Sequence, residues 1–255
     1  MWLAAVGALL LAGVLGGSLP AVAESPRLSE AWLAVESLPS SPSYAFYLRQ
    51  NDAAASEARN RRLVAELSEL IESLALSGER ERLAGLQAWQ QQLEAHRDSA
   101  EQARSPGRAD VAALAASPRH DPPLSSLVHF GHCETPPWVE VWHAAGVTRL
   151  PYRAGLTASN ALQQAAQATG GPGRADTAVL VTPLGAIQEL GVAAWNHQIV
   201  ALPPGSRLMV PTGLDTPGSD WLDANLPRHL ASRLPGDACE IHPLDDDRST
   251  TLPSQ

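Results

Sequence analysis

The chain has 255 residues and a formal net charge of -9 at neutral pH, with 18 basic against 27 acidic side chains. Every basic side chain is an arginine, because the sequence contains no lysine. Such an acidic chain disfavours nucleic acid and anionic lipid as partners, so an anionic ligand would need a local cluster of arginines. The lack of lysine also excludes a P-loop, which needs lysine to contact the phosphates.

The N-terminus has the pattern of an export signal. Residues 3–19 form an uncharged apolar run, which leads into Ala21-Val22-Ala23. This small-x-small pattern predicts a signal peptide over residues 1–23, cleaved after Ala23, and therefore a periplasmic protein. Because the segment before the apolar run lacks a basic side chain, an uncleaved anchor remains the alternative. No later apolar run reaches the roughly 20 residues that span a bilayer, so no membrane insertion is expected after cleavage.

Residues 24–105 change from a strand pattern to a helix pattern. Tyr44, Phe46 and Tyr47 lie in a run that suits one strand. The next two segments repeat apolar residues at helical spacing around Ser77-Gly78, a pair that ends one helix and allows another to begin. Their apolar positions are Leu63, Leu67, Leu70 and Leu74, followed by Leu83, Leu86, Trp89 and Leu93. This spacing predicts an antiparallel helical hairpin over about residues 56–105.

Residues 106–215 contain a crossover followed by a second patterned unit. The proline-rich segment 106–137 is expected to be irregular, with an edge strand at 111–114 or at 124–128. After it, the pattern predicts a hairpin from 138–142 and 147–150, a helix that begins after Thr157, and a second hairpin from 179–182 and 186–190. Short strands at 199–202 and 207–210 follow. This order describes a compact β-grasp-like unit.

The C-terminal region contains four leucines at a spacing of four, namely Leu222, Leu226, Leu230 and Leu234. They predict an amphipathic helix over residues 220–236. Asn225 as its cap would place Pro227 in the first turn, where a missing N–H costs little. The helix either covers a sheet edge of its own chain or docks on a partner. The polar, acidic residues 240–255 are expected to be disordered.

The two cysteines, Cys133 and Cys239, would be exported to an oxidising compartment, which favours a disulfide between them. The alternative is a zinc site, because His129, His132 and Glu134 are neighbours of Cys133 in the sequence. Their spacing matches no closed zinc motif, and a disulfide would remove the thiolate. We therefore expect no metal and no other cofactor.

Four segments, taken in order, resemble the capsule biosynthesis GfcC-like family of periplasmic proteins, whose domains are related to the SLBB modules of polysaccharide exporters. They are residues 107–124 with Gly107-Arg108 and Asp121-Pro122, residues 156–171 with paired glycines at the end, residues 181–196 with Trp195-Asn196, and residues 202–233. Asp121 stands where the family usually has asparagine. The resemblance covers about residues 56–235.

The resemblance implies an α+β fold with two β-grasp-like units, of which the first is degenerate. The first unit would occupy residues 24–135 and carry the helical hairpin as an insertion, and the second SLBB-like unit would occupy 136–215. The C-terminal amphipathic helix would follow at 220–236. The family also implies a role in the assembly or export of extracellular polysaccharide, with the polymer or an outer-membrane exporter as partner.

Three residues are candidates for ligand binding. The guanidinium of Arg108 offers several fixed donors to a sugar or a carboxylate, or else satisfies local carbonyl groups. Trp195 and Asn196 could stack on and hydrogen-bond to a saccharide, the alternative being a buried tryptophan beside an asparagine that holds a loop. No catalytic residue is assigned, because the chain lacks a Gly-x-Ser-x-Gly elbow and a pair of catalytic carboxylates cannot be located from sequence.

We therefore expect a non-enzymatic periplasmic accessory protein for capsule or exopolysaccharide biosynthesis or export. The alternatives are a periplasmic carbohydrate-active enzyme that acts on the polymer and a general periplasmic interaction scaffold.

Overall fold

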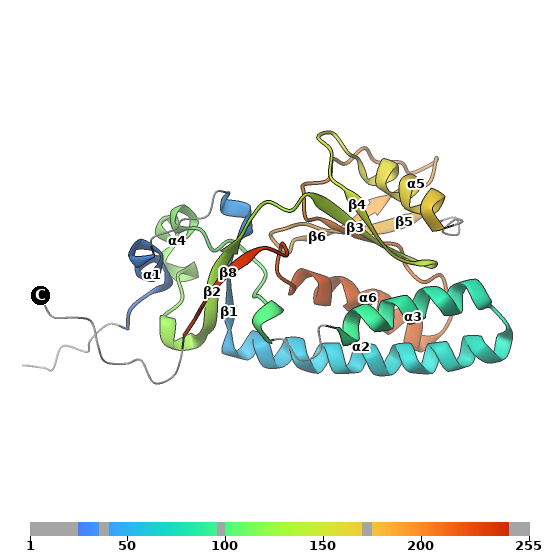
Figure 1. The fold of residues 1–255 in the computed structure, drawn as a ribbon, viewed down its shortest axis with the longest axis horizontal. Helices are drawn as coiled ribbons and strands as arrows, with labels where there is room; N and C mark the ends of the chain where they lie inside the picture. The colour runs from blue at the N-terminus through green and yellow to red at the C-terminus, as the bar shows by residue number, and fades with distance from the viewer. Residues whose placement is uncertain (1–24, 36–40, 96–99, 170–174, 245–255) are drawn as a thin grey trace, which may run out of the picture.

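A computed structural model describes residues 25–35, 41–95, 100–169 and 175–244. These residues form two separate β-sheets and six α-helices, which confirms the α+β class (Figure 1). The expected signal peptide and Gly170-Gly171 lie outside the described residues. Across the described ranges, no helix is both long enough and apolar enough to cross a membrane.

The predicted helical hairpin is confirmed. Helix α2 (Gln50–Ser77) follows directly on strand β1 (Ala45–Arg49), and α3 (Arg80–Glu94) returns beside it. Gly78 ends α2 in a left-handed conformation with φ 81°, which glycine adopts without steric cost. Its N–H donates to the carbonyl oxygen of Leu74 at 3.1 Å. The buried residues of the seam are Leu63, Leu67, Leu70, Leu74, Leu86, Trp89 and Leu93.

The second unit contains a five-stranded sheet in the order β4-β3-β7-β5-β6. Strands β3 and β7 are parallel, whereas the other neighbours are antiparallel. The two hairpins and the helix between them therefore form as predicted, but residues 199–202 make only a single bridge, from Ala201 to Thr157. The elements are β3 (Trp138–His143), β4 (Gly146–Pro151), α5 (Ala158–Thr169), β5 (Thr177–Val181), β6 (Ile187–Gly191) and β7 (Arg207–Met209).

Both faces of this sheet are covered by helices. The small residues of α5 allow it to pack closely on one face, against Val139, Val141 and Leu208. Trp142 and Met209 point to the opposite face, where they join the core formed with α2, α3 and α6. Successive side chains of a strand alternate between faces, so the apolar strands fill both layers. Figure 1 shows α6 between the sheet and α2, whereas α3 contacts β4 of the sheet directly.

The C-terminal helix α6 (Pro217–Ala231) begins earlier than predicted. Thr216 caps it, with Pro217 as the first helical residue and reciprocal bonds between Thr216 and Ser219. Asn225 is therefore not the cap, and Pro227 lies inside the helix. Burial of three leucines against the core offsets the hydrogen bond lost at Pro227. Since Leu222, Leu226 and Leu230 are fully buried, the helix covers its own chain.

The first unit contains a three-stranded antiparallel sheet in the order β1-β2-β8. Strand β2 (Leu127–Cys133) is central, not an edge strand as expected from residues 124–128. Strand β8 (Cys239–Pro243) comes from the segment that was expected to be disordered, so that prediction is wrong for residues 240–243. Pairing with β2 satisfies the backbone of this polar segment, and Cys239 is bonded to Cys133. Residues 245–255 lie outside the described part.

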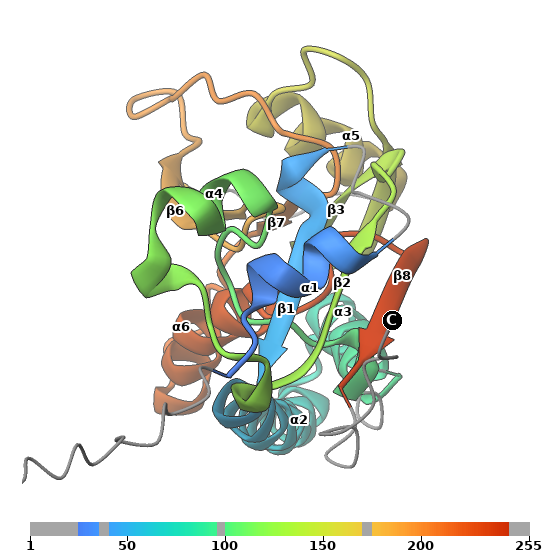
Figure 2. The same ribbon diagram turned by 90° about the vertical axis from the view of Figure 1, so that its left-hand side faces the viewer.

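Two short helices cover this sheet, as Figure 2 shows from that end of the molecule. In α1 (Leu28–Ala34), Trp32 makes an edge-to-face contact with Phe130 at 5.1 Å between ring centroids. Residues 111–114 belong to α4 (Val111–Ala116) and not to a strand, because Asp110 caps this alanine-rich segment. The remaining 3₁₀ turns are Pro42–Tyr44, Ala100–Gln102, Pro118–His120 and Leu124–Ser126.

Candidate functional site

Arg108 lies at the start of the crossover, two residues before the cap of α4. Its Nε and Nη2 donate to the two carboxylate oxygens of Asp110 at 2.9 and 3.0 Å. Asp110 is buried and also accepts from the backbone N–H of Ala113. The hydrogen bonds that Arg108 donates to Asp110, and the charge of that carboxylate, raise the pKa of Arg108 above its ordinary value. The carboxylate fixes one edge of the guanidinium, while the side chain remains 56% exposed.

The Arg108 segment contacts the second unit. The N–H of Gly107 donates to the carbonyl oxygen of Leu184 at 2.9 Å, in the turn between β5 and β6. A side chain at Gly185 in the same turn would approach Pro106 to 2.8 Å, and this glycine has φ 80°. The close approach therefore places Arg108 near one end of the β5–β6 hairpin.

Trp195 is exposed and not a core tryptophan, so that alternative is wrong. Its side chain is 78% exposed, on the turn that follows β6. Asn196 holds this turn, because its Oδ1 accepts from the N–H of Ala193 at 2.9 Å and its Nδ2 donates to the carbonyl oxygen of Asp176 at 2.9 Å. The loop-holding interpretation of Asn196 thus agrees with its contacts, and it gives Trp195 a fixed backbone.

Arg108 and Trp195 do not share one pocket. Leu184 follows β5, whereas Asp176 and Gly191 mark the other end of the β5–β6 pair, where Thr177 faces Gly191. The three sequence candidates therefore divide between the two ends of a hairpin. The turn geometry brings Trp195 together with Asn196 and leaves Arg108 apart.

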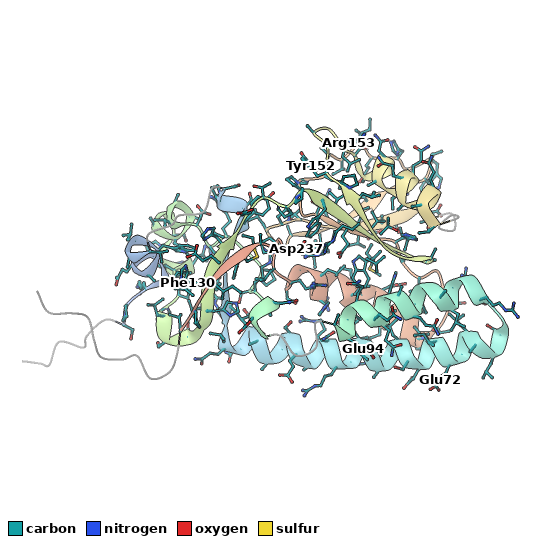
Figure 3. All side chains as sticks on the ribbon, in the orientation of Figure 1. Glu72, Glu94, Phe130, Tyr152, Arg153 and Asp237 are labelled. Atoms are coloured by element: carbon teal, nitrogen blue, oxygen red, sulfur yellow. A yellow bond between two sulfur atoms is a disulfide. The ribbon has the colours of Figure 1, made fainter. Side chains whose placement is uncertain are left out.

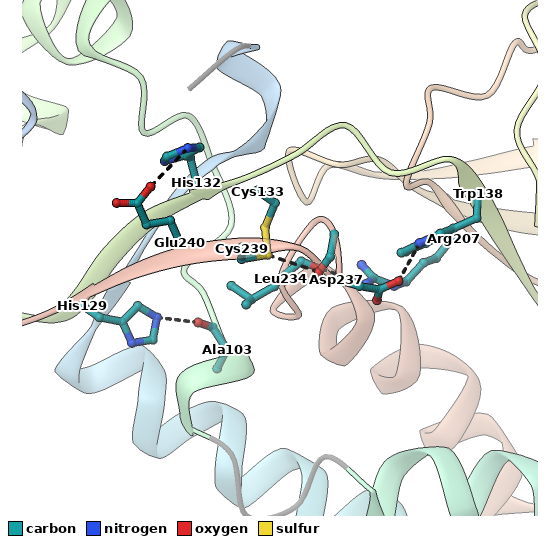
Figure 4. The surroundings of a disulfide bond; sticks show 11 residues. Ala103, His129, His132, Cys133, Trp138, Arg207, Leu234, Asp237, Cys239 and Glu240 are labelled. Carbon is teal, nitrogen blue, oxygen red and sulfur yellow. Dashed lines mark hydrogen bonds and ion pairs between the residues drawn. A yellow bond between two sulfur atoms is a disulfide. The ribbon is translucent and has the colours of Figure 1, made fainter. Parts of the chain in front are cut away.

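The predicted disulfide between Cys133 and Cys239 is present and joins β2 to β8 (Figure 4). The neighbouring histidines are directed elsewhere. His129 contacts the carbonyl oxygen of Ala103 at 2.9 Å, and His132 lies 3.9 Å from Glu240. Among the residues with described positions, no three His, Cys, Asp or Glu side chains are grouped as metal ligands. Cys133 has no thiolate to offer in this state.

A cluster of buried charges between the two units was missed by sequence reasoning. Glu140 on β3 accepts from Trp142 Nε1 at 2.7 Å and forms ion pairs with Arg149 at 3.2 Å and Arg207 at 3.6 Å. Both Glu140 and Arg207 are buried. The signal was a single charged residue inside an apolar strand, as in Val139-Glu140-Val141.

The same cluster reaches Asp237, which lies between the two sheets (Figure 3). Asp237 accepts from Trp138 Nε1 and from Arg149 Nη1, each at 2.8 Å. The guanidinium of Arg149 also lies 4.2 Å from the centre of the Trp138 ring. The network therefore connects β3 and β4 to the segment between α6 and β8.

Two buried arginines of this cluster satisfy carbonyl groups at the C-terminal end of α6. Arg207 donates to the carbonyl oxygens of Leu230 and Leu234, and Arg104 Nε donates to that of Ala231 at 3.3 Å. The C-terminal end of a helix carries partial negative charge, so nearby cations stabilise the helix. Burial lowers the pKa of Arg104 to about 9, and the nearby charge of Arg207 contributes to this shift as the smaller cause.

Burial alone would raise the pKa of Glu140, but the combined effect of its neighbours is larger. Arg207, Arg233, the Trp142 hydrogen bond and Arg149 together hold this pKa below its ordinary value. Glu140 is thus a charged residue with a structural role. Its hydrogen bond and ion pairs are made with Trp142, Arg149 and Arg207.

Comparison with protein families identifies one domain. Residues 146–235 match the family described as Capsule biosynthesis GfcC C-terminal. The match begins with β4 and ends just after α6, and it confirms the resemblance to the GfcC-like family. No curated protein matches the chain. The family domain implies a role in capsule biosynthesis.

Proposed function

We propose that this protein, with its GfcC C-terminal capsule biosynthesis domain in residues 146–235, is a non-enzymatic periplasmic accessory of capsule or exopolysaccharide biosynthesis or export. It acts by binding the polysaccharide, an outer-membrane exporter, or both. The family match supports the role in capsule biosynthesis, and the exposed side chains of the β5–β6 hairpin support the binding function.

The exposure of Trp195 is the observation that best supports binding of the polymer. Trp195 is 78% exposed and therefore presents a large apolar area to water. Core packing does not explain this position. The bonds of Asn196 fix the backbone of the turn, which lowers the entropy lost when a ligand is bound. The flat indole face suits the C–H face of a sugar ring, and the amide fixes the loop that carries it.

Arg108 provides a second contact for an extended ligand. It lies near the opposite end of the β5–β6 hairpin from Trp195, and a five-residue strand spans roughly 17 Å. A polymer can reach both residues, whereas one small molecule cannot. The ion pair with Asp110 orients the guanidinium and leaves part of it exposed to solvent.

Strand β6 offers a surface for an exporter. It is the last strand of the five-stranded sheet and pairs with β5 on one side. An edge strand can accept another strand through its free backbone groups. Ile187 on this strand is also exposed.

The environments of three acids support the non-enzymatic assignment. Glu140 is paired with arginines, Asp110 with Arg108, and Asp121 accepts from the N–H and the hydroxyl of Ser29. Each carboxylate stabilises a local structure. These contacts are typical of structural acids and not of a general acid and base that face a shared cleft.

Deletion of the gene, with measurement of surface polysaccharide, tests the proposal. We expect the deletion strain to lose most of its surface polymer and the wild-type gene to restore it. Wild-type amounts of polymer in the deletion strain would refute the proposed function.

A further inference from the structure

A surface depression of about 620 Å³ lies on the first unit, and neither Arg108 nor Trp195 lines it. Three separate parts of the chain line it. Arg27 precedes α1, Arg49 ends β1, and the crossover contributes residues between Pro118 and Ser126. Its volume is within the roughly 300–1,000 Å³ of ligand sites in proteins.

The lining is basic although the chain as a whole is acidic. Three arginines, at positions 27, 49 and 119, face one acid, Asp121. The carboxylate of Asp121 already accepts from the N–H and the hydroxyl of Ser29, at 3.0 and 2.7 Å. In a protein of net charge -9, this depression is therefore a local cluster of cations.

Two of these arginines are available to a ligand. Arg119 is exposed, and Arg49 is exposed with its guanidinium 5.2 Å from the ring centre of Tyr47. Within the described ranges, neither guanidinium forms an ion pair or a side-chain hydrogen bond with another residue. Unpaired guanidinium groups that face one depression repel each other, and an anion between them removes that repulsion.

Arg27 and the prolines give the depression a fixed wall. Arg27 Nη1 donates to the carbonyl oxygen of Asp121 at 2.8 Å and to that of Pro118 at 3.4 Å. Pro118, Pro122 and Pro123 restrict the backbone of the same segment. A wall fixed in this way loses little conformational freedom when a ligand binds.

We infer that this depression binds an anionic group, a carboxylate or a phosphate, carried by a saccharide segment of the polymer. The inference rests on the proposed function, since it specifies the chemistry of the polymer that the protein would bind. Planar guanidinium groups form paired hydrogen bonds with carboxylate and phosphate. The net charge of -9 disfavours contact of the rest of an anionic polymer with the protein as a whole, which favours binding at this site.

Binding of the full mature chain to defined oligosaccharides tests the inference. The probes are an oligogalacturonate, which carries carboxylates, a phosphorylated dextran oligomer, and neutral dextran of the same length. The variant is the double substitution Arg49→Gln and Arg119→Gln, and Arg119→Gln alone is the milder version. Arg153→Gln is the matched control, because Arg153 is also exposed and lies on the loop between β4 and α5, away from the depression (Figure 3). Thermal unfolding confirms that each variant is folded.

We expect wild type and Arg153→Gln to bind at least one anionic oligomer, more weakly as salt is added, and neutral dextran less well. The double variant should bind the anionic oligomer about tenfold more weakly or worse, because charge-assisted bonds are lost. Equal binding by wild type and the double variant, or no binding of either anionic oligomer by wild type, would overturn the inference. Either result leaves the proposed function standing if the deletion strain lacks surface polymer, so the two failures are distinguishable.

Discussion

Cys133 and Cys239 face each other in the ladder between β2 and β8 and are joined by a disulfide. The bond connects residues 106 positions apart, so the C-terminal strand completes a sheet that begins near the N-terminus. The five-stranded sheet and α6 lie within the loop that this bond closes. The first unit is therefore continuous in space but not in sequence.

Replacing both cysteines by serine should lower the free energy of unfolding. In the chain-entropy model, a cross-link that closes a loop of this length is worth up to about 4.7 kcal/mol. Chemical denaturation of the wild type and of the Cys133→Ser, Cys239→Ser variant measures the difference. A reducing agent should destabilise the wild type and leave the variant unchanged. Two thiols that react in folded, unreduced protein would contradict the disulfide.

Glu140→Gln should destabilise the protein by about 3 kcal/mol at neutral pH, because it leaves the buried Arg207 without its counter-charge. The folded pKa of Glu140 lies below its ordinary value of 4.5. Its stabilising contribution is therefore complete above pH 4.5 and is lost as the pH falls through the folded pKa.

The difference in unfolding free energy between wild type and Glu140→Gln should accordingly shrink on acidification, as followed by urea denaturation at several pH values. Glu189→Gln, on the exposed part of β6, serves as the control and should match the wild type. A difference that stays constant from neutral pH to well below pH 4.5 would argue against a charged Glu140.

Gly85→Ala should destabilise the protein, although alanine usually stabilises a helix by about 1 kcal/mol relative to glycine. A methyl group at Gly85 would lie 1.8 Å from the carbonyl oxygen of Ala144, so α3 would have to move away from the β3–β4 turn. That movement would weaken the bonds from Trp89 Nε1 to the carbonyl oxygens of His143 and Gly146. We expect a loss of about 1 to 3 kcal/mol by chemical denaturation. Stabilisation by alanine would refute this packing.

The protein should become less stable as the pH falls below about 6.5. Burial lowers the pKa of His129 and of His143 from the ordinary value of 6.5. The unfolded chain therefore takes up protons first, and stability is lost between pH 6.5 and the lower folded pKa values. His129→Gln removes one of these groups but keeps a donor for the carbonyl oxygen of Ala103. Its unfolding free energy should depend less on pH in this window, and an unchanged slope would contradict the assignment.

Local periodicity was enough to predict the helical hairpin and the two β-hairpins of the second unit. Leu63 and Leu67 repeat at the helical spacing because that face is buried, and Gly78 marks the turn for steric reasons. Such signals lie within a few residues of the elements that they define. The prediction of the disulfide also needed only the two cysteines and the expectation of export.

Long-range contacts determined the features that were missed. Strand β8 contains Glu240 and His242, and its polar pattern gave no indication that β2 would provide a partner. The start of α6 at Thr216 depended on a capping box that competed with the predicted cap at Asn225. The exposure of Trp195 could not be predicted either, because an apolar side chain alone indicates a core position.

Titration of the purified protein with the surface polymer of its own cells tests polymer binding most directly. We expect saturable binding by the wild type and about tenfold weaker binding by Trp195→Ala, since a stacking surface is removed. Leu76→Ala, which truncates another exposed apolar side chain, should bind like the wild type, and all three proteins should unfold at similar temperatures. Equal binding by the wild type and Trp195→Ala would contradict the assigned role of this turn.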